Sequence, residues 1–425
     1  MKKVLSVLLT MVMIFTLATG CGTQPATQSP TPVASSPSET TKSTPAPSKD
    51  AEKTKLTFAV QADSTDALNQ LIAAFNNSST LYTAEAVVMT NDSGNMHDQL
   101  LNSLSSKSSE YDIISMDVIW AGEFAAAGYL QPIDELLAAK GWKATDFNAG
   151  SMASGKYKGK NYVLPYFPDL GFLFFRSDIV NADDAQKLES GNYTWSDLLE
   201  LAKKYNGQGG TKYGHVYQSG QYEGLVCNLN EFTDNWSDIK GGLEMMNQFT
   251  KSDVTPKDIL IYTEGETHNA FLNGESVFAR NWPYMNGMAA SGEYAVKGTQ
   301  VGFAPLPTGG SVGGWILGIN ANTKNKAGAE EFLAFIAGPE GQKINATAGS
   351  YLPGFNALLS DSDVLSKNAL LTNKGFANAL ANTIARPVVA NYSEISDQIQ
   401  IKAHEYLSDN GQLDSATDAI SGLLK

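Results

Sequence analysis

The sequence of 425 residues has few cysteines, few histidines and a shortage of positive charge. Its two cysteines, Cys21 and Cys227, cannot form a disulfide framework for the fold. The histidines are scattered without the spacing of a metal site, so we expect surface or structural roles for them and no metal or cofactor. Lysine and arginine number 30 against 44 acidic residues, and the net charge of −14 excludes a nucleic-acid partner, because phosphate binding needs clustered positive charge. The four histidines are His97, His215, His268 and His404.

The common signatures of catalytic and nucleotide sites are also missing. The chain contains no GxxxxGK[ST], no strand-led GxGxxG, no HExxH, no GxSxG and no CxxC motif. Hydrophobic residues nevertheless make up 42% of the sequence and charged residues only 17%, so the chain can bury one large core or two medium ones. The common cofactor and nucleophile chemistries therefore do not apply, and we expect a folded protein with Cys227 buried as a small hydrophobic residue.

The first twenty residues have the pattern of an export signal. Lys2 and Lys3 precede an apolar run from Val4 to Leu17, which is shorter than the roughly 20 residues that span a membrane. We therefore predict a signal peptide over residues 1–20. Small residues just before Cys21 resemble the bacterial lipobox, although Ala18 stands where that pattern most often has leucine; the alternative is an ordinary leader with an incidental cysteine.

A polar segment follows Cys21. From Gly22 to Asp50, 12 of 29 residues are serine or threonine and 6 are proline, so the segment cannot bury enough apolar surface to order itself. We predict that residues 21–54 are a tether that starts at a lipidated cysteine. The protein is then exported and anchored to the outer face of the cytoplasmic membrane.

The rest of the chain alternates between the patterns of strands and helices. The β-rich run 56–60 precedes a helical stripe of Leu68, Leu71, Ile72 and Phe75, and the alternation continues through 84–89, 96–104 and 111–116. This β-α-β-α-β start predicts a parallel, doubly wound sheet. Further strands are expected at 162–166, 172–175, 276–281, 300–304 and 315–320.

Two helix boundaries are also readable. Thr194 with Asp197 predicts a capping box at a helix start, and Gly338-Pro339 is expected to end a helix over 327–337 by left-handed glycine geometry. The segment 168–171 is expected to separate two strands where the chain enters a second sheet. Because the folded part exceeds one ordinary core, we expect two α/β domains.

Aromatic residues lie beside loop-forming residues at several places, which suits a wall for stacking a flat ligand such as a sugar. Carboxylates and a guanidinium then pair with sugar hydroxyls through charge-assisted hydrogen bonds. For each aromatic residue the alternative is plain core packing; Asp117 could instead cap a helix, and Arg386 could form a surface ion pair. The aromatic candidates are Trp120, Tyr166, Trp282, Tyr284 and Trp315, and the polar ones are Asp117, Asp169, Glu223 and Arg386.

Five blocks, in order, resemble family 1 of the extracellular solute-binding proteins of ABC importers, which includes maltose- and trehalose-binding lipoproteins. The blocks are Asp117-Val118-Ile119-Trp120 with Glu123-Phe124 and Gly128-Tyr129-Leu130, Gly159-Lys160 with Leu164-Pro165 and Gly171 to Arg176, Gln221 to Leu225, Asn281-Trp282-Pro283-Tyr284, and Ala385-Arg386-Pro387.

The resemblance implies a two-lobed α/β fold of the periplasmic-binding-protein type II, with a sugar bound between lobes that close on it. It implies an N-terminal lobe of 55–165 plus 308–355 and a C-terminal lobe of 166–307 plus 356–425. Its ligand-facing positions correspond here to Asp117, Tyr166, Asp169, Trp282, Tyr284, Gly314, Trp315 and Arg386, and Asp63 is a candidate for an early polar contact. The implied partners are the transmembrane subunits of an ABC permease, and we expect a monomer.

We expect Trp282 and Trp315 to stack on the sugar, and the polar residues to select its hydroxyl pattern. The hinge is expected near 165–168 and 305–307. Two other functions stay open: a sugar-sensing surface receptor, and a secreted glycoside hydrolase with Asp117 and Asp169 as its carboxylate pair. The identity, linkage and length of the sugar do not follow from the sequence.

Overall fold

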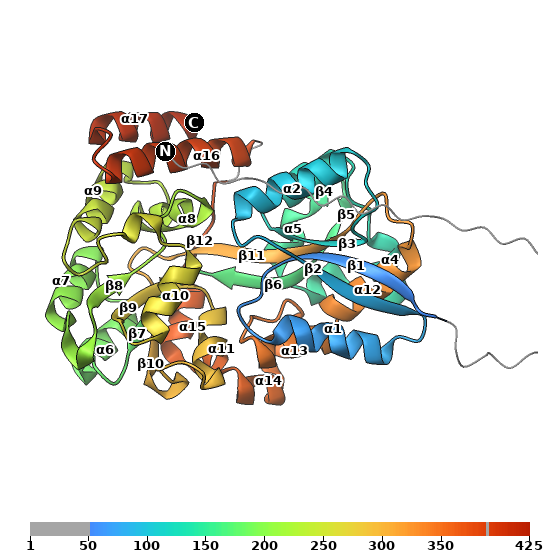
Figure 1. Ribbon diagram of the computed structural model, residues 1–425, viewed down its shortest axis with the longest axis horizontal. Helices are drawn as coiled ribbons and strands as arrows, with labels where there is room; N and C mark the ends of the chain where they lie inside the picture. Colours follow the sequence, from blue (N-terminus) through green and yellow to red (C-terminus); the bar gives the residue numbers. More distant parts are fainter. Residues whose placement is uncertain (1–51, 388–390) are drawn as a thin grey trace, which may run out of the picture. The chain divides into compact units, whose positions relative to one another are not determined.

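Two large β-sheets carry the part of the chain that this computed structural model describes, residues 52–387 and 391–425. The predicted signal peptide, Cys21 and nearly all of the predicted tether lie outside these residues. Figure 1 shows the two sheets side by side, each with helices on its faces.

The first sheet has six strands in the order β12-β11-β3-β1-β2, with β6 also paired to β11. Strands β1, β2 and β3 are parallel, which confirms the predicted start of the fold. Strand β11 runs antiparallel to both β3 and β6, so the completed sheet is mixed. The strands are β1 (Thr54–Gln61), β2 (Tyr82–Met89), β3 (Ile113–Asp117), β6 (Val163–Leu170), β11 (Gly310–Ile319) and β12 (Thr383–Ile384).

Side chains alternate between the faces of this sheet because successive residues of a strand point in opposite directions. Phe58 of β1 packs in the core on one face, and its neighbour Ala59 packs in the core on the other. The Phe58 face is covered by α1 (Ala67–Ser78), α4 (Asp134–Lys140), α5 (Ala149–Ser154), α12 (Lys326–Ala337) and α13 (Pro339–Ala348). The Ala59 face is covered by α2 (Ser93–Ser105) and α3 (Ala121–Ala126).

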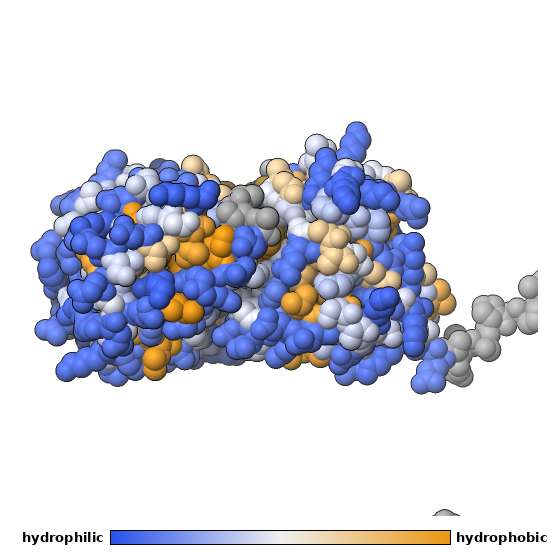
Figure 2. Space-filling model, turned by 90° about the horizontal axis from the view of Figure 1, so that it is seen from above, coloured by the Kyte–Doolittle hydropathy of each residue, from blue (hydrophilic) through white to orange (hydrophobic). Residues whose placement is uncertain are grey.

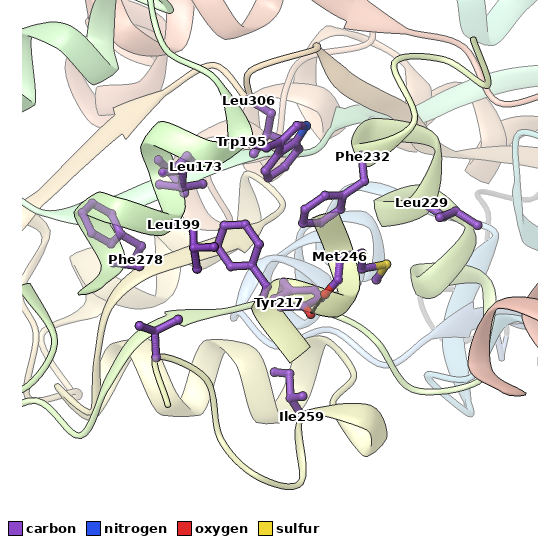
Figure 3. Close-up of a cluster of buried hydrophobic side chains, with 14 of the residues drawn as sticks. Leu173, Trp195, Leu199, Tyr217, Leu229, Phe232, Met246, Ile259, Phe278 and Leu306 are labelled. Atoms are coloured by element: carbon purple, nitrogen blue, oxygen red, sulfur yellow. Dashed lines mark hydrogen bonds between the residues drawn. The ribbon is translucent and has the colours of Figure 1, made fainter. Parts of the chain in front are cut away.

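The second sheet has four strands in the order β10-β7-β9-β8. All five residues of β7 are buried, and they alternate between two cores: Leu173 and Phe175 face one, and Phe172 and Phe174 face the other. Figure 3 shows the first of these cores, in which Trp195 stacks on Phe232 with ring centroids 3.9 Å apart. The strands are β7 (Phe172–Arg176), β8 (Tyr213–Val216), β9 (Ser276–Asn281) and β10 (Val301–Ala304).

Helices again cover both faces. Those of the Leu173 face are α6 (Ala182–Ser190), α7 (Trp195–Tyr205), α8 (Glu223–Phe232), α9 (Ile239–Thr250), α16 (Tyr392–Leu407) and α17 (Leu413–Leu423). Those of the Phe172 face are α10 (Glu264–Leu272), α11 (Tyr284–Ser291) and α15 (Lys374–Ala381). The remaining elements are α14 (Ser362–Lys367), the hairpin β4 (Lys156–Tyr157) and β5 (Lys160–Asn161), and short 3-10 turns at 144–146, 208–210, 259–261, 298–300, 356–360 and 369–372.

Strands β6 and β11 run between the two sheets (Figure 1). The chain enters the second sheet here, as predicted, but the break between the strands is shorter than expected: β6 continues to Leu170, and Gly171 alone separates it from β7. The strand continues through Pro168 because β11 pairs with it along this stretch, with Gly313 opposite Asp169 and Val312 opposite Leu170. Strand β12 pairs with the start of β11, so it is a third segment of the chain at the place where β6 and β11 run between the sheets.

The predicted helix boundaries have mixed outcomes. The capping box is confirmed: the Thr194 backbone N–H donates to the Asp197 carboxylate, and the Asp197 N–H donates to the Thr194 hydroxyl. Helix α12 ends at Ala337 as expected, but the left-handed glycine is wrong, because Gly338 has φ −79° and ψ 177°. The chain stays extended for one residue, and Pro339 then begins α13, where its missing N–H costs nothing.

The surface seen in Figure 2 is mostly hydrophilic, with hydrophobic residues in separate patches. Among the described residues, no helix combines the length and the apolar composition that crossing a bilayer requires. The large hydrophobic residues that are exposed come from separate segments: Leu81, Val88, Ile261, Leu359 and Leu380.

His215 in β8 is fully buried between the rings of Tyr217 and Phe249. Neither ring nitrogen has a hydrogen-bond partner among the described residues, and burial lowers the pKa of His215 to about 3. At pH values between this lowered pKa and the ordinary pKa of histidine, His215 is protonated in the unfolded chain and neutral in the folded chain. The contribution of His215 therefore lowers the free energy of unfolding by roughly 2 kcal/mol as the pH falls from 7.5 to 5.

Urea denaturation of the wild type and a His215→Leu variant at both pH values measures this contribution. The variant is expected to lose less stability than the wild type on acidification, by about that 2 kcal/mol. Parallel losses in the two proteins would show that His215 does not carry the pH dependence.

Candidate functional site

A cavity of about 340 Å³ lies between the two sheets. Its walls come from the ends of β1 and β3, from β6 and β11, from the starts of α8 and α10, and from the segments after β9 and β12. Eight of the ten ligand-binding residues predicted from the sequence line it: Asp117, Asp169, Glu223, Trp282, Tyr284, Gly314, Trp315 and Arg386. The topology thus brings together residues that are up to 269 positions apart in the chain.

Arg386 lies between two carboxylates of the cavity wall. Its Nη1 and Nη2 donate to the Asp117 carboxylate at 3.1 and 2.6 Å, and Nη1 also donates to Glu223 Oε1 at 3.0 Å. Glu223 accepts two further hydrogen bonds, from the hydroxyls of Tyr392 and Ser396 in α16. Burial raises the pKa of Glu223, while Arg386 opposes that shift. Because Asp117 ends β3 and Glu223 begins α8, Arg386 connects the two sides of the cavity.

Trp282 follows β9, and its indole is held on two sides. The indole N–H donates to Glu264 Oε1 at 3.1 Å, and the Arg280 guanidinium lies 4.0 Å from the ring centroid. Arg280 is fully buried and paired with the equally buried Glu231 through hydrogen bonds of 2.9 and 2.5 Å. A cation stacked on one face of an indole stabilises its position, so this pair supports the Trp282 side chain from behind the cavity wall.

Trp315 reaches the cavity from β11, where its backbone lies opposite Asp117 of β3 and Phe167 of β6. Its ring meets Trp120 edge to face, with centroids 5.7 Å apart and an interplanar angle of 89°. The two residues before it, Gly313 and Gly314, have no side chains to fill the space beside the strand. A Cβ on Gly313 would lie 3.0 Å from Trp282 Cζ3, and Gly314 has φ +123°, which side chains disfavour.

Tyr284 lies in the first turn of α11, and its hydroxyl is 2.9 Å from His268 Nδ1. Burial lowers the pKa of His268 to about 4, so this imidazole is neutral at pH 7. His268 therefore lines the cavity as an uncharged hydrogen-bonding group, and its sequence context gave no sign of that position.

Asp169 lies in β6 with one carboxylate oxygen accepting from the Leu170 N–H at 2.9 Å. Burial raises the pKa of Asp169 well above its ordinary value; the Leu170 N–H and the Arg280 guanidinium oppose the shift, and the nearby carboxylates of Glu264 and Asp117 add to it. The side chain is thus a carboxyl group short of positive partners, in contact with the cavity.

The structure does not bring Asp63 and Tyr166 into the cavity wall. Asp63 accepts from the backbone N–H groups of Thr65 and Leu68 at the start of α1 and from the Tyr351 hydroxyl. Tyr166 packs in the core of the six-stranded sheet beside Phe58. The register between β6 and β11 shifts at this point: Phe167 lies opposite Trp315 and Pro165 opposite Ile316, so Tyr166 is an extra residue of β6 without a partner in β11. Its side chain packs in the same core as Phe167.

Several cavity residues were not found from the sequence. Phe167 could have been inferred from its spacing of two from Asp169 on a strand. Glu264 could not, because its contacts with Trp282 and with the Tyr222 hydroxyl depend on the packing of α10 against the segment after β9. The additional polar and aromatic residues of the wall are Gln61, Ser64, Asn91, Ser93, Phe167, Tyr222, Thr263, Glu264, Glu266, His268 and Tyr351.

Comparisons with known proteins agree with this architecture. The sequence profile described as "Bacterial extracellular solute-binding protein" matches residues 61–343. The chain is 27% identical over 349 residues to a probable ABC transporter-binding protein of Deinococcus radiodurans, covering 76% of this chain and 81% of that protein. It is 24% identical over 317 residues to the maltotriose-binding protein of Pyrococcus abyssi, covering 68% of this chain and 64% of that protein.

Among solved structures, maltose-bound MalE3 of T. maritima is 28% identical and has a TM-score of 0.77, with 87% of this chain and 99% of that chain covered. The match confirms the predicted α/β fold of the periplasmic-binding-protein type. The matched family consists of binding proteins and not of enzymes. From its sequence and its fold, the chain therefore belongs to the bacterial extracellular solute-binding proteins.

Proposed function

We propose that this protein captures a mono- or oligosaccharide in the cavity between its sheets and delivers it to the membrane subunits of an ABC importer. The observation that carries the proposal is that Trp282 and Trp315, from different sheets, line one cavity together with carboxylates and Arg386. Aromatic faces stack on sugar rings, and charged groups bind their hydroxyls. The names of the maltotriose-binding and maltose-bound relatives support a sugar as the ligand.

The proposal extends to the export and motion of the protein. Residues 1–20 are removed as a signal peptide, Cys21 carries a lipid at the outer face of the cytoplasmic membrane, and residues 21–54 tether the folded part as a monomer. The lobes comprise 55–165 plus 308–355 and 166–307 plus 356–425, and they hinge near 165–168 and 305–307. A sugar that contacts both lobes stabilises the closed arrangement by its differential affinity.

A calorimetric and melting-shift screen of the purified protein tests the proposal. The panel is maltose, trehalose and the cello-, xylo- and manno-oligosaccharides. We expect at least one class to bind and to raise stability by about 2.7 kcal/mol at 100 times its dissociation constant. If no saccharide in the panel binds or shifts the melting temperature, the proposed function is wrong.

The binding saccharide is then measured against a Trp315→Ala variant. Loss of this aromatic contact is expected to weaken binding by roughly 1–3 kcal/mol. Trp142→Ala is the matched control, because Trp142 packs on Phe147 and Phe355 away from the cavity, and it should keep wild-type affinity. Wild-type affinity in Trp315→Ala would remove Trp315 from the site.

A further inference from the structure

The ionisable groups around the cavity are unequal in sign. Five carboxylates line it against one guanidinium and one imidazole. The carboxylates are Asp117, Asp169, Glu223, Glu264 and Glu266, and the basic groups are Arg386 and His268.

The positive groups are already neutralised or uncharged. Arg386 is 6% exposed, and its guanidinium is shared between Asp117 and Glu223. Arg280, behind Trp282, is fully buried and paired with Glu231. His268 has a pKa of about 4 and is neutral at pH 7. Among the described residues that line the cavity, no positive charge is therefore left to meet an anionic ligand.

Several carboxylates, in contrast, have only neutral partners. Glu264 accepts from the Trp282 indole N–H and the Tyr222 hydroxyl, and Glu266 accepts from the backbone and hydroxyl of Thr263. For Asp169, the hydrogen bond found among the described residues is the one from the Leu170 N–H. Negative charge that lacks a cationic partner attracts a cation and repels an anion.

We propose that the cavity selects its saccharide by charge, binding a protonated amino sugar more tightly than the neutral sugar and rejecting the uronate, with Asp169 as the counterion of the amine. This inference rests on the proposed function and deepens it. Burial raises the pKa of the Asp169 carboxyl, and a bound ammonium group favours its ionised form. The amine therefore gains a charge-assisted hydrogen bond, whereas a hydroxyl gives Asp169 a neutral donor. A uronate adds a further carboxylate to a wall that has no free cation for it.

Matched ligand trios test the selectivity in the full mature protein by calorimetry at pH 7. Glucose, glucosamine and glucuronate are compared, with the corresponding galactose and mannose trios, and with maltose, its 6-amino-6-deoxy and 6′-amino-6′-deoxy derivatives and its uronates. In a series that binds, the amine is expected to bind about tenfold tighter than the neutral sugar, and the uronate at least about tenfold more weakly.

Asp169→Asn identifies the residue responsible, because asparagine keeps the shape and removes the charge. The amine is expected to lose its advantage in this variant, to within about threefold of the neutral sugar. Asp183→Asn is the matched control. It replaces an exposed aspartate of α6 that lies outside the cavity, so the variant should keep the wild-type order of ligand affinities. A melting curve for Asp169→Asn shows whether the variant is folded. The ligand series on the wild type tests the charge selectivity without this variant.

The outcomes separate the two proposals. If no saccharide of any charge binds, the proposed function fails. If neutral sugars bind but amines bind no tighter, or uronates bind equally well, the saccharide function stands and the charge selectivity is wrong. If the order appears but survives Asp169→Asn, Asp169 is not the counterion.

Discussion

Glu231→Gln is expected to lower the free energy of unfolding by about 3–5 kcal/mol, the scale for breaking a buried ion pair by removing one partner. Glu231 and Arg280 are both fully buried, so the variant leaves a buried guanidinium without its ion-pair partner. The loss extends beyond the pair. Glu231 Oε1 also accepts from the Ser311 N–H of β11, so the substitution disturbs a contact with the first sheet as well.

Urea denaturation at pH 7.5 measures the effect, and Glu231→Gln/Arg280→Met is the control. Replacing both partners by groups of similar size removes the unpaired charge, so the double variant should recover most of the lost stability. It should still weaken saccharide binding, because Trp282 loses the cation on its inner face. A cost below about 1 kcal/mol for Glu231→Gln would show that water or a rearranged side chain compensates Arg280.

Arg386→Met is expected to cost about 3–5 kcal/mol at neutral pH, because it leaves Asp117 and Glu223 unpaired and close together. The sign of its pH dependence follows from the same geometry. Burial and the neighbouring Asp117 charge raise the pKa of Glu223 in the folded state, and removing the guanidinium that opposes them raises it further. The folded state then binds more protons, so the deficit relative to wild type shrinks as the pH falls from 7.5 to 5.

The triple variant Asp117→Asn/Glu223→Gln/Arg386→Met separates charge from packing. With both carboxylates made neutral, most of the deficit at pH 7.5 should disappear, and the extra pH dependence should disappear with it. If the triple variant is as unstable as Arg386→Met at both pH values, packing by the arginine side chain rather than its charge holds this part of the wall.

The parts of the fold that depend on local sequence were predictable. The stripe of Leu68, Leu71 and Phe75 is buried in α1, and Thr194 caps α7. The continuation of β6 past Pro168 was not predictable, because it depends on pairing with β11, which is more than a hundred residues later. The prediction of a left-handed conformation at Gly338 was wrong for a related reason, because the proline after it begins the next helix, α13.

The candidate site divides in the same way. Motif blocks located Asp117, Trp282 and Arg386, and the family resemblance added Trp315; all four line the cavity. They do not reveal which residue of a strand faces inward, so Tyr166 was named where Phe167 lies. The Arg280–Glu231 pair joins two segments 49 residues apart, and nothing in either segment by itself marks it.

Cys227 lines the cavity from α8, and only 2% of its surface is exposed. Burial raises the pKa of its thiol, so the reactive thiolate is scarce at neutral pH. A cysteine introduced at an exposed position such as Asp183 would therefore react with a maleimide dye far faster than Cys227. The natural thiol can stay in place when the protein is labelled as a fluorescent sensor for its ligand.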